Sequence, residues 1–296
     1  MINFMKYKTI YFLISLLFLL PSVYFLSRYG LKPSLDFTGG SLLELTIKPT
    51  HMEPTTALLE DIAKQGFNIH SIQQTSQGTF LFKGKDFSQS LNQKFQHEIS
   101  TFIGESTEIS FENIGPTLGR ELIKKTLTSL IIAASLIMLY VTSRFKDKKY
   151  GICAILAMLH DILILLGVFS FLGVYRHVQV DALFVTALLT ILSFSVHDTI
   201  VVYDRIRESL KLNPKLSFTQ TVNKAVTETL GRSINNSLTI IFMLLSLYLL
   251  GGPTIKWFIF ALLIGTISGT YSSTFTAAPL LVLWEQIKAR QSKPTP

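Results

Sequence analysis

The chain has 296 residues, of which 48% are hydrophobic and 16% are charged, and its formal net charge is +8. Water-soluble domains usually contain about 25% charged residues, so this composition argues against an ordinary soluble protein and favours a membrane protein. The single cysteine, Cys153, excludes an internal disulfide and a multi-cysteine metal site.

The first apolar segment, residues 9–26, is long enough to cross a membrane as a helix. Lys6 and Lys8 precede it, as they would in a signal peptide. However, the apolar run is longer than the core of a signal peptide, and no small-x-small cleavage site occurs before Arg28. We therefore interpret the segment as a retained membrane anchor.

Residues 29–120 form the only stretch between apolar segments that is long enough to bury a core of its own. The residue pattern predicts four strands, at residues 41–48, 67–74, 78–83 and 107–112, the first from the alternation of Leu42, Glu44 and Thr46. It also predicts two helices, at residues 54–65 and 87–102. The order βαββαβ is that of a ferredoxin-like fold, with two helices on one face of an antiparallel sheet. Nothing in this domain indicates catalysis.

Five further apolar segments follow this domain. The fifth span of the chain begins with polar residues and becomes purely apolar from Leu238. We predict these spans at residues 127–142, 152–174, 182–203, 234–250 and 257–283. Between the fourth and fifth spans, residues 215–230 place apolar side chains at helical spacing, which predicts an amphipathic helix on the cytoplasmic membrane surface.

The distribution of positive charge predicts the orientation. More than half of the 27 lysine and arginine residues lie before span 1, between spans 2 and 3, between spans 4 and 5, and after span 6. Such residues stay on the cytoplasmic side, so we expect both termini in the cytoplasm and the first large loop in the periplasm. The basic balance then reflects orientation and does not indicate a nucleic-acid partner. The predicted divisions are residues 1–28, 29–120, 121–283 and 284–296.

Several charged or strongly polar groups lie where the spans should be apolar. A charged side chain inside a bilayer costs about 2.5 kcal/mol or more, so each is a candidate functional residue. The candidates are His160 and Asp161 in span 3, His197 and Asp198 in span 4, and Arg232 and Asn236 at the start of span 5.

Reversible proton binding is the chemistry that these groups could share. Burial favours the neutral form of an aspartate and a nearby guanidinium favours the charged form, so Asp198 could bind and release a proton. Arg232 and Asn236 are i,i+4 neighbours, and both could face Asp198 across the interface of spans 4 and 5. The alternative is structural: Asp198 forms a buried ion pair with Arg232 or a polar contact with His197.

A metal site is a further interpretation of the two His-Asp pairs. Adjacent residues lie about 100° apart on a helix, so one pair cannot present both ligands to one ion without strain. Four ligands could meet only if spans 3 and 4 touched at matching depth. We expect no metal and no cofactor.

The last span carries a stripe of small residues. Gly265 and Gly269 have GxxxG spacing and precede several serines and threonines, a pattern typical of close helix packing. Pro279 should kink the span near its cytoplasmic end.

Six short motifs resemble the SecF branch of the SecD/SecF family, within the RND superfamily. They run in order from the first span to the last, so together they are far more specific than any one of them. The motifs are LDFTGG at 35–40, IGPTLGREL at 114–122, LHDI at 159–162, SVHDTIVVYDRIRESL at 195–210, GRSINNSLT at 231–239 and GTISGTYSSTFTAAPLL at 265–281.

This resemblance implies an α-helical membrane protein with six transmembrane helices of half-RND type and one α+β ferredoxin-like extracytoplasmic domain. It implies a multi-pass subunit of the bacterial inner membrane that pairs with SecD, serves the SecYEG channel and uses the proton-motive force to promote preprotein export. YajC and YidC are further candidate partners. No enzymatic activity is expected.

The resemblance also implies roles for particular residues. Asp198 corresponds to the acidic residue of span 4 that the family links to proton flow, and Arg232 to its basic partner. His197 stands where the family often has Asn, so the response to pH could differ. Gly39 and Gly40 fit either a hinge between span 1 and the outer domain or a plain tight turn.

Two other functions are alternatives. A half-RND exporter of lipids or small molecules would share the plan, although that class usually carries both halves in one longer chain. An intramembrane enzyme using the His-Asp pairs ranks last, because no nucleophile or complete ligand set accompanies them.

Overall fold

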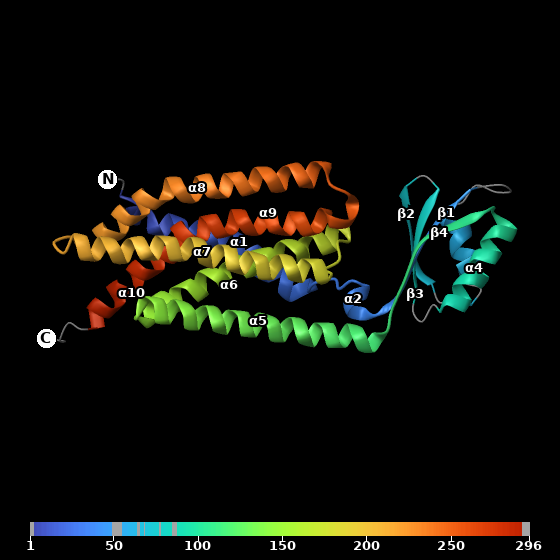
Figure 1. Cartoon of the computed structure of the whole chain (residues 1–296), viewed down its shortest axis with the longest axis horizontal. Helices are drawn as coiled ribbons and strands as arrows, with labels where there is room; N and C mark the ends of the chain where they lie inside the picture. The colour runs from blue at the N-terminus through green and yellow to red at the C-terminus, as the bar shows by residue number, and fades with distance from the viewer. Residues whose placement is uncertain are drawn as a thin grey trace. The chain divides into compact units, whose positions relative to one another are not determined.

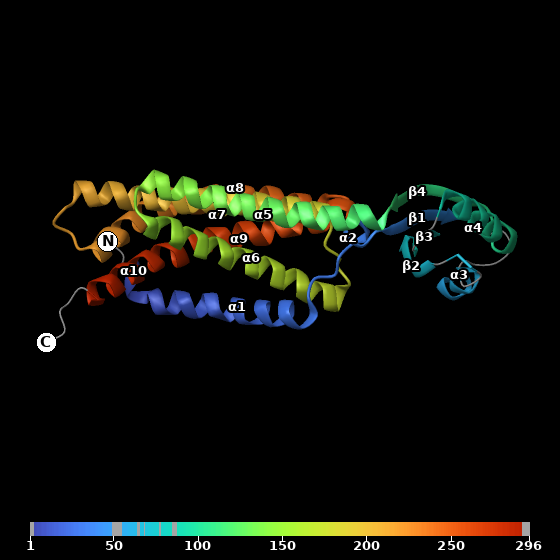
Figure 2. The ribbon, with the colours of Figure 1, turned by 90° about the horizontal axis from the view of Figure 1, so that it is seen from below.

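The computed structural model describes residues 3–48, 55–63, 66–67, 69–76, 78–84 and 88–291. The chain divides into two compact units. One unit, which we call the bundle, consists of Met1–Lys32 and Thr128–Pro296; the other, which we call the sheet domain, is Pro33–Leu127. Figures 1 and 2 show the ribbon in two views.

Long helices make up the bundle. Among the described residues, six helical stretches are long and apolar enough to cross a membrane, which confirms the six predicted spans. Most of them extend beyond the predicted bounds, because polar residues at the span ends continue the helical hydrogen bonding. The helices are α1 (Lys8–Tyr29), α5 (Pro116–Phe145), α6 (Lys148–Arg176), α7 (Ala182–Leu212), α8 (Phe218–Leu250), α9 (Lys256–Ser272) and α10 (Ala278–Gln291).

Side-chain caps explain where three of these helices begin. Asp147 accepts a hydrogen bond from the backbone N–H of Lys149 at the start of α6. Asp181 accepts from the N–H of Phe184 at 2.7 Å at the start of α7. Ser217 forms a capping box at the start of α8. Each cap satisfies a backbone donor that the first helical turn leaves free.

The core of the bundle depends on close contact between helices. Helix α1 packs along α6, and α7 packs along α9 and α8 (Figure 2). A Cβ atom added at Gly167 of α6 would lie 2.1 Å from Cβ of Ser22 in α1. At that point only glycine allows the two backbones to come so close.

The predicted amphipathic surface helix over residues 215–230 is wrong. Those residues belong mainly to α8, which runs without a break from Phe218 to Leu250. The apolar side chains of Val222 and Val226 are fully buried inside the protein, and Asn223 Oδ1 accepts a hydrogen bond from the N–H of Met5 at 2.8 Å. The apolar face thus packs on the N-terminal segment and the bundle, where no lipid is needed to cover it.

The last span contains an irregularity just before the predicted kink at Pro279. Helix α9 continues into five residues of π-helix, Ser273–Ala277, which we call the π segment, and then into α10. Proline lacks an N–H and would leave the carbonyl four residues earlier unpaired in an α-helix, so a π turn before it is a reasonable accommodation. The hydroxyl of Tyr203 in α7 donates to the carbonyl oxygen of Ala277 at 3.3 Å.

The sheet domain has the predicted βαββαβ order. Its four strands are antiparallel and arranged β2-β3-β1-β4, the arrangement of a ferredoxin-like fold. A single-turn helix, α2 (Leu35–Thr38), precedes them. The other elements are β1 (Gly40–Ile47), α3 (Thr56–Ala63), β2 (Ile69–Ser76), β3 (Thr79–Gly84), α4 (Gln89–Phe102) and β4 (Ser106–Ile114).

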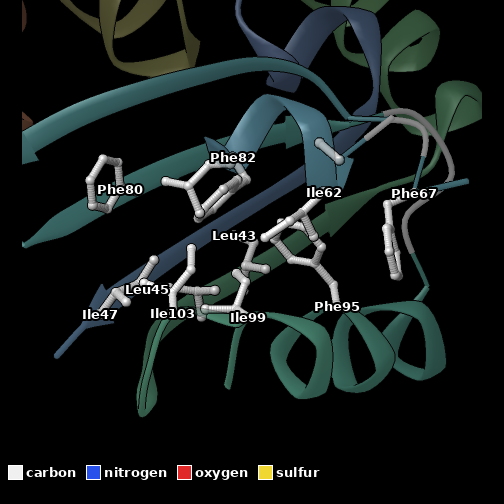
Figure 3. Close-up of a cluster of buried hydrophobic side chains, with 12 residues drawn as sticks. Leu43, Leu45, Ile47, Ile62, Phe67, Phe80, Phe82, Phe95, Ile99 and Ile103 are labelled. Carbon is white, nitrogen blue, oxygen red and sulfur yellow. The ribbon is translucent and has the colours of Figure 1, made fainter. Parts of the chain in front are cut away.

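The core of this domain lies between the sheet and its two helices (Figure 3). Leu43 and Leu45 alternate along β1, and Phe80 and Phe82 alternate along β3, so all four point to one face. Phe95 of α4 packs on Phe82 with ring centroids 5.0 Å apart. The alternating residues that predicted the first strand, Leu42, Glu44 and Thr46, lie on the opposite, half-buried face.

Candidate functional site

Asp161 lies in the centre of the bundle, on α6, with an exposed fraction of 0%. Three serine hydroxyls donate to its carboxylate, each at 2.6 Å: Ser195 from α7, and Ser268 and Ser272 from α9. The Nδ1 atom of His160 lies 3.0 Å from Oδ1. Neutral donors from two other helices therefore surround this carboxylate, and they replace the water that it loses on burial.

His160 is also buried, and only one of its ring nitrogens is bonded. Since a carboxylate only accepts, its contact with Asp161 indicates a hydrogen on Nδ1. Nε2 is buried and has no hydrogen-bond partner among the described residues. The His160 side chain lines a cavity of about 260 Å³ whose other walls come from α1 and α9, including Phe18, Ile267 and Tyr271. The Tyr271 ring lies roughly parallel to the imidazole, with centroids 6.2 Å apart.

Asp198, on α7, is the second buried carboxylate, with an exposed fraction of 4%. The hydroxyl of Ser233 on α8 donates a short hydrogen bond to Oδ2, and the hydroxyl of Ser273 in the π segment donates to the same atom at 3.2 Å. Within the described part of the chain, Asp198 forms no ion pair. This carboxylate is thus also held by hydroxyl groups.

Arg232 does not face Asp198, contrary to the sequence-based expectation. Its side chain is exposed, as is that of Asn236, whereas Ser233 and Ser237 of the same helix are buried. The inward face of α8 is therefore the one that carries the small hydroxyls. Because these side chains are small and can be satisfied by hydrogen bonds, they let α8 approach α7, which a buried guanidinium would prevent.

Arg232 instead lines a polar pocket of about 480 Å³ between α7 and α8. Arg205 of α7 also lines it, and donates to Glu208 and to Glu228 at 2.6 Å each. Thr229, another lining residue, lies one helical turn before Ser233. The pocket thus reaches α8 about one turn from the serine that binds Asp198.

His197 is exposed on α7, one residue from Asp198 but on a different side of the helix. The structure therefore brings His160, but not His197, into contact with its neighbouring aspartate. Among the described residues, no three His, Cys, Asp or Glu side chains gather in a way that could hold a metal ion.

The serines that bind the two aspartates were missed as functional residues by the sequence analysis, which assigned those of the last span to packing. The signal that could have found them is their spacing. Ser268 and Ser272 are i,i+4 neighbours on one face of α9, and Ser195 lies three residues before Asp198 on α7.

The glycines of the last span lie against α7. A Cβ atom at Gly265 would lie 2.3 Å from the Ile191 side chain, and one at Gly269 would lie 3.2 Å from Ser195 Cβ. Gly269 therefore allows α9 to approach the segment that presents Ser195 to Asp161.

Gly39 and Gly40 form a defined turn between α2 and β1. Their φ angles are 70° and 132°, which non-glycine residues rarely adopt. A Cβ atom at Gly40 would lie 2.9 Å from the carbonyl oxygen of Gly84, and one at Gly119 would lie 2.5 Å from that of Phe37. The geometry accounts for these glycines as a tight turn, and the predicted hinge stays a prediction.

Comparison with known families gives two matches. Residues 94–287 match the family described as "Protein export membrane protein SecD/SecF, C-terminal". Residues 24–50 match the SecD/SecF GG motif.

Individual relatives match over nearly the whole chain. The chain is 41% identical to the protein translocase subunit SecF of Thermobaculum terrenum, covering 96% of this chain and 94% of that protein. It is 37% identical to the subunit of the same name from Anaerolinea thermophila, with the same coverage of both chains.

A solved structure is also similar. The crystal structure of SecDF from Thermus thermophilus, described as a translocon-associated membrane protein, superposes with a TM-score of 0.82 at 32% identity. The match covers 96% of this chain but 39% of that longer one.

Proposed function

Because the chain belongs to the SecD/SecF family of protein-export membrane proteins, we propose that it acts as a SecF-type subunit of a protein translocase. The six apolar helical stretches fit a multi-pass membrane protein. We place it in the bacterial inner membrane with both termini in the cytoplasm and the sheet domain in the periplasm, as the positive charges indicate. Its role is transport, not catalysis.

SecD is the proposed partner subunit. The chain matches only 39% of the fused SecDF chain, whose name joins the two subunits. The bundle also carries polar side chains on its outer surface within the spans, among them His197 and Asn236. Such groups are costly against lipid tails, and a second subunit would cover them. SecYEG, with YajC and YidC, completes the proposed assembly, and preproteins are the translocated substrate.

The observation that carries the proposed mechanism is the environment of Asp198. An ionisable residue inside the membrane, held by hydroxyls and without an ion pair among the described residues, is suited to gain and lose a proton. Serine hydroxyls can both donate and accept, so they can satisfy either form of the carboxyl group. We propose that the proton-motive force acts through this exchange to promote protein export.

Arg232 then acts at the mouth of the polar pocket and not as a direct partner. Its permanent positive charge lies beside the turn of α8 that carries Ser233. A guanidinium there opposes the entry of other cations into the pocket. Arg232 can therefore lie next to the buried Ser233 without forming an ion pair with Asp198.

The test is export by a bacterial strain that lacks its own SecF-type subunit and carries full-length variants. Asp198→Asn keeps the side-chain volume but cannot ionise. We expect it to reduce the uncoupler-sensitive export rate by a factor of ~10 or more. Asp198→Glu should retain part of it. Glu121→Gln is the control, because it removes an exposed carboxylate from α5 that does not line the polar pocket.

Export is read as the appearance of a secreted preprotein in the periplasm, with and without an uncoupler. Membrane levels of each variant are measured in parallel. Full uncoupler-sensitive export by Asp198→Asn would refute the proposed proton role, whereas the family membership would stand.

A further inference from the structure

The two buried aspartates are linked by neighbouring serines. Ser272 donates to Asp161 at 2.6 Å, and the next residue, Ser273, donates to Asp198 at 3.2 Å. Ser195, which also binds Asp161, lies three residues before Asp198 and so on the same side of α7. Two helices therefore connect the surroundings of one carboxylate with those of the other.

Ser272 and Ser273 differ from the other serines that donate to the aspartates, because the hydroxyl of each also has a second acceptor. Ser272 Oγ lies 3.3 Å from the carbonyl oxygen of Gly269, and Ser273 Oγ lies 3.1 Å from that of Thr270. In the described part of the chain, the hydroxyl of Ser268 donates to Asp161 alone. Ser272 and Ser273 can therefore turn away from a carboxylate without losing their hydrogen bond.

Proton binding by a carboxylate requires such a turn. An ionised aspartate only accepts hydrogen bonds, whereas the neutral acid carries an O–H that must itself donate. When a proton forms an O–H bond at Asp161, Ser272 can direct its own hydrogen to Gly269 and accept the new hydrogen on Oγ. The proton leaves a hydronium ion of the solvent, so one O–H bond breaks there as one forms at Asp161, and Asp161, Ser272 and the Gly269 carbonyl all remain hydrogen-bonded.

The position of the two serines connects this rearrangement to the backbone. They flank the point where α9 changes into the π segment. π-Helical turns are rare and occur mostly at functional sites. Conversion of such a turn to α-helix rotates the residues on one side of it by about 100°, so a change at Ser272 and Ser273 bears directly on the orientation of the whole last span.

The groups around Asp161 include titratable residues but no bonded cation. His160 on α6 bonds to Asp161, and the ring of Tyr271 on α9, whose hydroxyl donates to the Tyr11 carbonyl of α1, stacks on His160. Asp198 on α7 is related to Asp161 through the adjacent serines Ser272 and Ser273. Among the described residues, no lysine or arginine side chain bonds to Asp161. The Nε2 atom of His160 is buried without a partner among the described residues, and His160 lines the cavity beside α1, which is a different cavity from the pocket at Arg232.

We infer that Asp161 is a second proton-binding residue of the bundle, and that Ser272 and Ser273 are positioning residues that link its protonation to that of Asp198. The inference rests on the proposed function in that Asp198 binds the transported proton. It adds a second site and a named connection between the two sites.

Infrared spectroscopy of the purified full-length protein tests whether Asp161 binds a proton. Protonation of a carboxylate produces a C=O stretching band, which is followed as the pH is lowered stepwise. We expect Asp161→Asn and Asp198→Asn each to remove a separate part of this signal. A signal in Asp161→Asn equal to that of the wild type at every pH would overturn the inference.

The link is tested with two serine variants that are closely matched. Ser272→Ala and Ser268→Ala each delete one 2.6 Å donor to Asp161, but only Ser272 adjoins Ser273. We expect Ser272→Ala to move the pH midpoint of the Asp198 signal by about 1 unit, the scale of coupled titrations, and Ser268→Ala to leave it in place. Equal shifts in both variants, or none in Ser272→Ala, would refute the linking role.

These measurements separate the inference from the proposed function. The infrared signals are read on purified protein and do not require export. If export by Asp198→Asn is normal while Asp161 still titrates, the proposed function fails and the second site stands. If export depends on Asp198 but the carboxyl signal does not change in Asp161→Asn, the second site fails alone.

Discussion

The sheet domain and the bundle fill their interiors with different kinds of side chain. The sheet domain buries a hydrophobic cluster that includes three phenylalanines with exposed fractions of 0–1%, and its buried polar side chains among the described residues are few: Ser41, Thr79 and Asn92. In the bundle, serines, threonines, two aspartates and a histidine are buried alongside the apolar residues. The hydrophobic effect rewards apolar burial in water, whereas in lipid the apolar side chains can face outward and small polar ones can join the helices.

This difference explains where chemistry is available in each part. A core made of leucine, isoleucine and phenylalanine holds a shape but binds no proton. A core joined by hydroxyls can hold Asp161 and Asp198 at the centre of the helices and satisfy them there. The sheet domain is thus suited to hold a fixed shape, and the bundle is the part in which buried ionisable groups are available.

The largest expected effect comes from breaking the apolar core of the sheet domain. Phe95→Ala removes a ring that contacts both Phe67 and Phe82 at 5.0 Å, and should cost about 3–5 kcal/mol of unfolding free energy. Pulse proteolysis of the full-length chain in urea measures the loss. Phe102→Ala, on the same helix but with 49% of Phe102 exposed, is the control and should change stability by about 0.5 kcal/mol or less. Comparable losses in both variants would contradict the assigned core.

A smaller effect is expected where the bundle depends on close helix contact. Gly265→Ala places a methyl group 2.3 Å from the buried side chain of Ile191, which should cost about 1–3 kcal/mol and lower the Tm in detergent. Gly231→Ala, in the interior of α8 with nothing within 4 Å, should be neutral or stabilising by about 0.5–1 kcal/mol, because alanine favours a helix. A Tm for Gly265→Ala equal to that of wild type would show that α7 and α9 are not held at this distance.

The smallest expected effect is a pH dependence of stability caused by a partly buried lysine of the sheet domain, Lys83. Burial lowers the pKa of Lys83 on β3 below its ordinary value. Between that lowered pKa and the ordinary one, the unfolded state binds more protons than the folded state, so the stability of the domain should rise with pH across this range. Pulse proteolysis from neutral pH to about pH 10 measures the slope, which should be smaller in Lys83→Met. An unchanged slope would assign the pH dependence to other groups.

Much of the fold could be predicted from the sequence because both solvents impose simple patterns. Apolar runs of sufficient length predicted the six spans, and the order of strand and helix segments predicted a sheet that pairs in ferredoxin-like order. The two buried aspartates could be found as well, since a carboxylate within an apolar run is rare and costly and usually marks a functional position.

The partners of these aspartates could not be predicted, because they depend on the rotation of each helix about its axis. Arg232 and Ser233 are adjacent, and about 100° of rotation decides which of them meets Asp198. That rotation is determined by small residues on other helices far away in the sequence. Similarly, Pro279 indicated a disturbance of the last span but not that it would take the form of a π-helix.

The uninterrupted length of α8 has a mechanical consequence. Its 33 residues make a rod of about 50 Å, whereas the hydrocarbon core of a membrane is only about 30 Å thick. About 20 Å, or roughly two fifths, of the rod therefore lies outside the hydrocarbon. The end that begins at Phe218 holds the N-terminal segment through Asn223, which bonds to Met5 and Asn3. A tilt of α8 about its part in the membrane therefore displaces this end, and the N-terminal segment that is bonded to Asn223 moves with it.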